Sequence, residues 1–211
     1  MDVTPGGRYS DGVNVPNLRE RTRQAVRAQL MTVAWDLFVE QGYDATTVDE
    51  IAAAAGMSQR SFFRYFGAKE DVVLVKFEAV GALLAEELAR QPASEDVWTA
   101  LRRSFEVIVE PTERDPRHGL VLLRITDQSP ALRAGRLEQQ THWQELLTPL
   151  VATRLATSAT GAGHDPRAAA LTAAALACLN VANASWLDSG GTQSLRRLLD
   201  DAMGAVRPGT F

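Results

Sequence analysis

Hydrophobic residues recur at spacings of three and four along most of this chain, starting just after Leu18. The first such set is Val26, Leu30, Val33, Ala34, Leu37 and Phe38. This spacing places apolar side chains on one face of a helix, which we expect to end near Gly42. Residues 1–17 show no such pattern and contain glycine and proline with few large apolar groups, so they predict a flexible arm.

The segment after this helix predicts two short helices joined by a glycine turn. Thr47 and Glu50 have the spacing of a capping box, in which two side chains satisfy free amide groups at a helix start. Gly56 suits the left-handed turn that ends this helix, and Ser58 can cap the next one, expected over residues 59–65. The predicted unit is therefore helix, turn, helix.

A long helix is predicted over Lys69–Arg90, where Pro92 stops it. Five later helix starts carry a polar residue in the capping position: Ser94, Asp115, Ser129, Asp165 and Thr192. Pro149 is expected to kink or divide the helix that begins at Pro130, and residues 156–163 are expected to form a mobile loop. Because no alternating strand pattern or fixed repeat occurs, the sequence predicts an all-α fold of about nine helices.

The composition is that of an ordinary globular protein, with 45% hydrophobic residues in 211. No stretch reaches the roughly 18 uninterrupted apolar residues of a membrane span, and residues 1–16 do not resemble a secretion signal. We therefore expect a cytoplasmic protein without membrane contact. Cys178 is the only cysteine, which excludes an intrachain disulfide and a cysteine-rich zinc site.

Local signatures of catalysis are missing from the sequence. The three histidines, His118, His142 and His164, show no metal-ligand spacing, and no glycine-rich phosphate loop occurs. We therefore expect no enzyme activity, no metal and no cofactor.

The formal net charge of -4 argues against a protein that coats nucleic acid, although a specific DNA-binding protein needs only a local basic surface. Two such groups occur: Arg19, Arg21, Arg23 and Arg27 in the first helix, and Arg60, Arg64 and Lys69 farther on. A solvated helix face is the alternative interpretation of the first group.

The second short helix has the pattern of a recognition helix, which presents polar side chains to DNA bases while its other face packs on the preceding helix. Phe62 and Phe66 are four residues apart and can face inward. This leaves Gln59, Arg60, Phe63 and Arg64 facing outward. An aromatic run of this kind also suits plain core, but outward polar groups directly after a glycine turn favour DNA recognition.

Residues 19–72 resemble the DNA-binding domain of the tetracycline-repressor (TetR) family. The matching motifs are Ala34-Trp35-Asp36-Leu37-Phe38, Gly42-Tyr43, Thr46-Thr47-Val48, Ile51-Ala52, Ala55-Gly56-Met57-Ser58, Phe66 and Lys69-Glu70-Asp71-Val72. They occur in the family's order and spacing. The resemblance implies a three-helix DNA-binding domain over residues 18–70, followed by a helical-bundle domain for ligand binding and dimerisation over residues 71–211.

The resemblance further implies a symmetric homodimer that places two recognition helices in successive major grooves of a pseudo-palindromic DNA operator, about 34–36 Å apart. By position, the residues expected to contact phosphates are Thr47, Ser58, Tyr65 and Lys69. Those expected to approach bases are Gln59, Arg60, Ser61 and Arg64, with the Phe63 ring near a thymine methyl group. Two departures affect this interface, since Phe63 replaces a tyrosine common in the family and Arg60 replaces a residue that is often small.

In the family, the last two helices pair with those of a second subunit. The alanine-rich helix after residue 166 fits this role, with expected interface residues Leu171, Ala174, Ala175, Cys178, Ala182 and Trp186. Close packing within one subunit is the alternative.

The family also implies a pocket for a small hydrophobic effector. Its expected lining is Trp98, Phe105, Leu120, Leu123, Arg124, Trp143 and Asn183. Arg124 interrupts an apolar run and is a possible polar anchor, while ordinary core or surface is the alternative for each of these residues.

Together these features predict a DNA-binding transcription regulator, with repression as the family's usual mode. A helical adaptor without DNA binding is the alternative, because the chain is net acidic. An electrophoretic shift with the protein's own upstream DNA would distinguish the two. The operator, the effector and the regulated genes stay open.

Overall fold

A computed structural model of the chain describes residues 18–156 and 166–206. The predicted arm, and all but the first residue of the predicted loop at 156–163, lie outside these ranges. The described residues form ten helices and no strand. They are α1 Leu18–Gln41, α2 Val48–Ala54, α3 Gln59–Phe62, α4 Lys69–Arg90, α5 Val97–Ser104, α6 Glu106–Arg114, α7 Pro116–Gln128, α8 Pro130–Ala156, α9 Pro166–Asp188 and α10 Leu195–Ala205.

The predicted all-α fold is confirmed, with differences at several helix boundaries. Two predicted caps are wrong, because Asp96 rather than Ser94 caps α5 and Ser194 rather than Thr192 caps α10. The single helix expected after Ser94 is divided at Phe105, a fully buried residue between α5 and α6. This division explains why there are ten helices and not nine. The recognition helix α3 is shorter than expected and continues as a turn to Tyr65. Pro149 does not divide α8, which runs through it as one helix.

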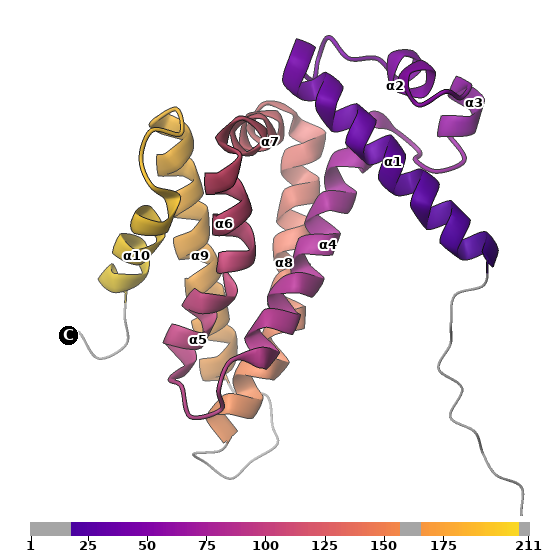
Figure 1. Cartoon of the computed structure of the whole chain (residues 1–211). Coiled ribbons are helices and arrows are strands. Elements are labelled where there is room, and N and C mark those ends of the chain that lie inside the picture. The colour runs from indigo at the N-terminus through magenta and orange to yellow at the C-terminus, as the bar shows by residue number, and fades with distance from the viewer. Residues whose placement is uncertain (1–17, 157–165, 207–211) are drawn as a thin grey trace, which may run out of the picture.

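The first three helices form a compact unit at one end of the molecule (Figure 1). Their shared core is built around fully buried Phe38, Ile51 and Phe62. This core also includes Val72, Val73 and Phe77 of α4, Ile125 of α7 and Leu132 of α8. This three-helix unit is therefore packed on the remaining helices rather than tethered to them.

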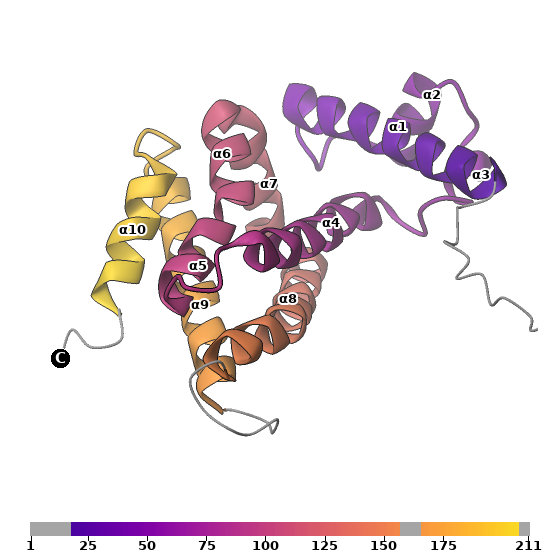
Figure 2. The ribbon, with the colours of Figure 1, turned by 60° about the horizontal axis from the view of Figure 1, so that its bottom comes forward.

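The remaining helices form a bundle in which α4, α8 and α9 are the longest members (Figures 1 and 2). Helix α8 packs against both α4 and α9, and α10 lies along α9 at the side of the bundle away from α4. Two glycines bring α4 and α8 close together. A Cβ atom at Gly81 would lie 2.5 Å from Trp143 of α8, and one at Gly135 would lie 2.5 Å from Leu74 of α4.

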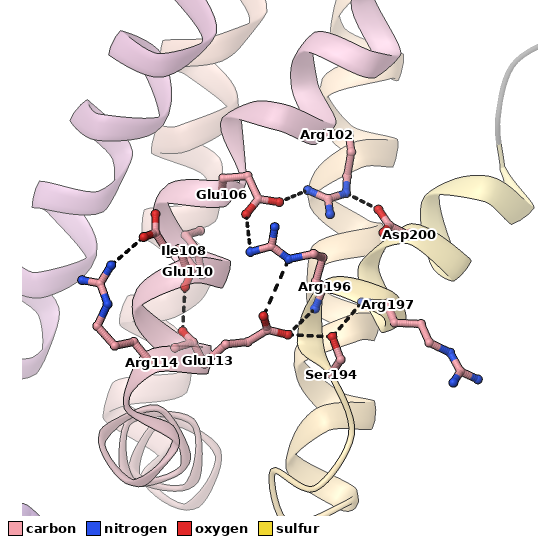
Figure 3. A network of polar contacts seen from close by, with 11 residues as sticks. Arg102, Glu106, Ile108, Glu110, Glu113, Arg114, Ser194, Arg196, Arg197 and Asp200 are labelled. Atoms are coloured by element: carbon pink, nitrogen blue, oxygen red, sulfur yellow. Dashed lines mark hydrogen bonds and ion pairs between the residues drawn. The ribbon is translucent and has the colours of Figure 1, made fainter.

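A chain of polar contacts fastens α10 to α5 and α6 (Figure 3). The Glu113 carboxylate accepts hydrogen bonds from the Ser194 hydroxyl at 2.7 Å and from the Arg196 amide at 3.0 Å. The Arg196 guanidinium pairs with Glu106 at 2.8 Å, and Glu106 also pairs with Arg102 at 2.7 Å. These contacts add to the burial of Leu195, Leu199 and Met203, which hold the apolar face of α10 on the bundle.

One described helix, α9, is long and apolar enough to cross a membrane by length and composition alone, with a mean hydropathy of 1.4. Its buried residues, among them Leu176, Leu179 and Trp186, belong to the core of the bundle. A core helix of a globular protein has these same properties.

Candidate DNA interface and ligand cavity

Helix α3 has an apolar inner face and a polar outer face. The Ser58 side chain accepts a hydrogen bond from the Ser61 amide at 3.2 Å and begins the helix. Phe62 and Phe66 are 0% and 2% exposed and pack against each other with ring centroids 5.5 Å apart. The exposed side chains of α3 and the turn after it are Gln59, Arg60, Phe63 and Arg64, as predicted. Ser61 and Tyr65 are half-buried.

Thr47, a predicted phosphate contact, also caps helix α2. Its hydroxyl accepts a hydrogen bond from the Glu50 amide at 3.2 Å and donates one to the Glu50 carboxylate at 2.9 Å. The Thr47 amide donates to the same carboxylate at 2.8 Å, and this bond lowers the pKa of Glu50. The predicted capping box is therefore present and charged at neutral pH, and it fixes the start of α2.

Lys69, another predicted phosphate contact, connects the end of α1 to the start of α4. Its ammonium donates hydrogen bonds to the backbone oxygens of Tyr43 at 2.7 Å and Thr46 at 2.9 Å, and it lies 4.0 Å from the centre of the Tyr43 ring. Two of its three N–H groups are thus used inside the chain, which leaves one for a phosphate. The sequence motif did not indicate this structural role.

The basic start of α1 lies beside the recognition helix. A shallow groove is lined by Leu18, Arg19, Thr22 and Arg23 of α1 together with Arg64 and Tyr65. Three guanidinium groups therefore converge on one surface next to the outer face of α3. This arrangement favours a DNA-contacting role for Arg19 and Arg23 over a plain solvated face.

A cavity of about 170 Å³ lies inside the bundle, between α4, α6, α7, α8 and α9. Its apolar walls include Phe77, Val80, Val107, Ile108, Leu176 and Leu179. Polar side chains also line it: Lys76, Arg136, Gln139, Gln140, Asn180 and Asn183. The Trp143 indole forms part of the wall and is held by a 3.0 Å hydrogen bond from its Nε1 to the Phe77 carbonyl. Apolar walls with a few polar groups are the usual character of a small-molecule site.

Of the seven residues predicted to line a pocket, the cavity includes three: Leu123, Trp143 and Asn183. Trp98 and Phe105 are instead buried in the core, where the Trp98 indole donates a hydrogen bond to the Met203 carbonyl at 3.1 Å. Leu120 packs beside Gly191, and Arg124 is exposed.

Sequence reasoning missed the cationic part of the cavity wall. Lys76 could have been noticed, because it interrupts the apolar positions of its helix in the same way that Arg124 interrupts those of α7. Arg136 gives no comparable signal, since its sequence neighbours are polar as well as apolar.

The residues predicted for a dimer interface divide into two groups. Ala175, Cys178, Ala182 and Trp186 are at most 6% exposed and pack inside their own chain. Leu171 and Ala174 are half-buried. The outward face of the same helix carries Ala170, Ala177, Val181 and Ala184, with Val181 59% exposed.

The fold and these surfaces define a helix-turn-helix DNA-binding protein with a helical regulatory bundle. Comparison with known proteins gives the family. Residues 30–75 match a sequence model described as bacterial regulatory proteins, tetR family, and residues 95–210 match one described as the MftR C-terminal domain. The chain belongs to the TetR family of bacterial transcription regulators.

A curated relative agrees with this assignment, and solved structures share the fold. The chain is 28% identical over 206 residues to the HTH-type transcriptional regulator TcmR of Streptomyces glaucescens, covering 94% of this chain and 90% of that protein. The FadR repressor of Thermus thermophilus, solved with lauroyl-CoA, is similar with a TM-score of 0.63 and 24% identity over 88% of this chain and 95% of that one. FadR of Bacillus subtilis, solved with stearoyl-CoA, has a TM-score of 0.62 and 18% identity over 87% and 99% of the two chains.

Proposed function

We propose that this protein is a cytoplasmic homodimeric repressor that is released from a pseudo-palindromic operator by a small, mainly apolar ligand. The observation that carries the proposal is the course of helix α4. It begins at Lys69, beside the DNA-binding helices, and its side chains Lys76, Phe77 and Val80 line the cavity. One rigid element therefore contacts both sites.

The outer face of α3 supports the operator part of this proposal. Arg60 and Arg64 are exposed there, and arginine is suited to guanine in the major groove. Thr47, Ser58, Tyr65 and Lys69 remain the proposed phosphate contacts.

The outward face of α9 supports the dimer. Small side chains at Ala170, Ala177 and Ala184 allow a second helix to approach closely, and Val181 exposes apolar surface between them. We propose that this face, with Ala174 and Leu171 at its edge, pairs with its counterpart in a second subunit.

The effector is proposed to occupy the cavity between α4 and α9. Two structural neighbours were solved with acyl-CoA molecules, so acyl thioesters belong among the first compounds to test. A cavity of this size holds a group about as large as an aromatic ring without enlarging.

The test is a pair of reciprocal binding measurements. Operator affinity is measured with DNA from upstream of the protein's own gene, with and without a ligand found by thermal-shift screening, and ligand affinity is then measured with and without operator. Coupling of about 1–3 kcal/mol should weaken each affinity about 5- to 150-fold. A protein that shifts no upstream DNA at low salt would instead be the helical adaptor, and a bound ligand that changes neither affinity would exclude release by that compound.

A further inference from the structure

The cavity has two cations at the end nearest the DNA-binding helices. Lys76 comes from α4 and Arg136 from α8. Leu74 lies against Gly135, and one to two turns farther along both helices the Trp143 indole donates a hydrogen bond to the Phe77 carbonyl. The two helices therefore run parallel and bring residues 76 and 136 to the same end. Figures 1 and 2 show that the starts of α4 and α8 lie at the end of the bundle that faces α1.

Both cations lack a close carboxylate among the described residues, and Asp115 acts on Lys76 only at longer range. Among the described residues, neither Lys76 nor Arg136 forms an ion pair or a side-chain hydrogen bond. Burial lowers the pKa of Lys76, and the negative charge of Asp115, which acts on it from the start of α7, opposes this only in part. Two cationic residues that line one cavity and have no ion-pair partner among the described residues favour an anion in that cavity.

A neighbouring amide strengthens this character. Gln139 lines the same part of the cavity, and its side-chain oxygen is buried without a hydrogen-bond partner. A rotation of this amide by half a turn would direct its NH₂ group to the position of the oxygen, where it could donate to an anion.

Lys76 also contacts the DNA-binding unit. Its ammonium lies 4.3 Å from the centre of the ring of Trp35, a residue of α1 that is 5% exposed. Trp35 in turn packs edge-on against Phe38, with ring centroids 5.6 Å apart, in the core that supports α3. The same side chain therefore forms part of the ligand cavity and part of the contact between α4 and α1.

We propose that the effector carries an anionic group on a compact apolar body, and that Lys76 and Arg136 bind this group while the apolar body lies between α4 and α9. Binding draws the Lys76 ammonium from the Trp35 ring to the anion, and this transfer changes the packing of α1 on α4. The inference rests on the proposed function of the cavity as the effector site, and it adds the chemical class of the ligand and the residue that transmits its binding.

The first test compares anionic ligands with neutral ligands of the same shape, in the absence of DNA. The probes are octanoate and 2-naphthoate, each against its alcohol, 1-octanol and 2-naphthalenemethanol, with octanoyl-CoA to distinguish a phosphate from a carboxylate. We expect each anion to bind about tenfold or more tightly than its alcohol. Lys76→Met and Arg136→Gln should remove this preference and leave the affinity for the alcohols within about twofold. Arg133→Gln, an exposed residue of the same helix outside the cavity lining, is the matched control.

The second test follows the four tryptophans by ¹⁹F NMR of protein labelled with 5-fluorotryptophan, with Trp35 assigned from Trp35→Phe. Trp143 lines the cavity and reports occupancy by any probe, whereas Trp98 lies in the distant core and serves as a reference. The bound anion should shift the signals of Trp143 and Trp35, and the bound alcohol only that of Trp143. In Lys76→Met, anion at saturating concentration should shift Trp143 alone.

Each outcome decides the proposal. If no anion binds more tightly than its alcohol, the anionic class is wrong. If Trp35 responds equally to alcohol and anion, or responds to the anion in Lys76→Met, transmission through Lys76 is wrong. Circular dichroism confirms that each variant is folded. Because these measurements contain no DNA, a failure to bind an operator would contradict the proposed function and leave their result unchanged.

Discussion

Several side chains on the proposed DNA-binding surface also form hydrogen bonds that stabilise the fold. Thr47 and Ser58 cap helices through their hydroxyl groups, and Lys69 bonds to two backbone oxygens. Arg60 differs from them, since it is exposed at the start of α3 and forms no ion pair or side-chain hydrogen bond with the described residues. Its substitution is therefore a test of DNA contact that leaves the fold intact.

Arg60→Ala should cost about 1–3 kcal/mol per half-site on the operator and relax preference at one or two base positions. The measurement is affinity for the operator, for single-base operator variants and for random DNA at one salt concentration. Arg114→Ala, exposed in the regulatory half, should leave all three affinities unchanged. Equal weakening by Arg60→Ala on operator and random DNA would show that Arg60 contacts only the backbone.

At the scale of single elements, local sequence predicted several helix starts, because a cap acts over three or four residues, although the caps of α5 and α10 lie two residues later than expected. Thr47 with Glu50, and Ser58, are examples whose hydrogen bonds match the expectation. The break at Phe105 had no local signal, since it depends on burying that ring among helices distant in sequence. The cavity was harder still. Trp98 and Phe105 are aromatic residues of the kind that often lines ligand pockets, but in the folded bundle both are buried in the core.

The hydrogen bonds that attach α10 to α6 could not be predicted from the sequence either, because Glu113 and Ser194 are 81 residues apart. Burial raises the pKa of Glu113, but hydrogen bonds from the Arg196 amide and the Ser194 hydroxyl, with the Arg196 charge, outweigh it and lower the pKa overall. A carboxylate whose pKa is lower in the folded state stabilises the fold above its unfolded pKa of about 4.5, and this stabilisation is lost as the pH falls through the folded value.

Glu113→Gln should therefore lower the free energy of unfolding by about 1 kcal/mol at pH 7 and by much less near pH 3. The check is urea denaturation of wild type and variant at several pH values. Glu110→Gln is the matched control, because Glu110 lies on the same helix and its ion pair, with Arg114, is at the surface. If the variant loses the same free energy of unfolding at pH 7 and at pH 3, the charge of Glu113 does not stabilise the contact with α10.

At the scale of the whole molecule, a single charge can test the dimer interface proposed for the outward face of α9. Val181→Arg should convert the dimer to a monomer, because a large charge would be buried without a partner in the proposed interface. Mass by light scattering, with helicity by circular dichroism, is the measurement. Leu83→Arg, which places the same charge on an exposed position of α4, should stay dimeric. A folded Val181→Arg dimer would move the interface away from this face.

The core shared by α1, α2, α3 and the starts of α4 and α8 has a consequence for how the protein unfolds. Val72, Phe77 and Leu132 complete the packing around Phe38 and Phe62, so the helix-turn-helix unit loses much of its apolar burial without the regulatory half. The two halves should consequently melt in one cooperative transition. An effector bound in the cavity then raises the melting temperature of the DNA-binding helices as well, even while it lowers their affinity for DNA.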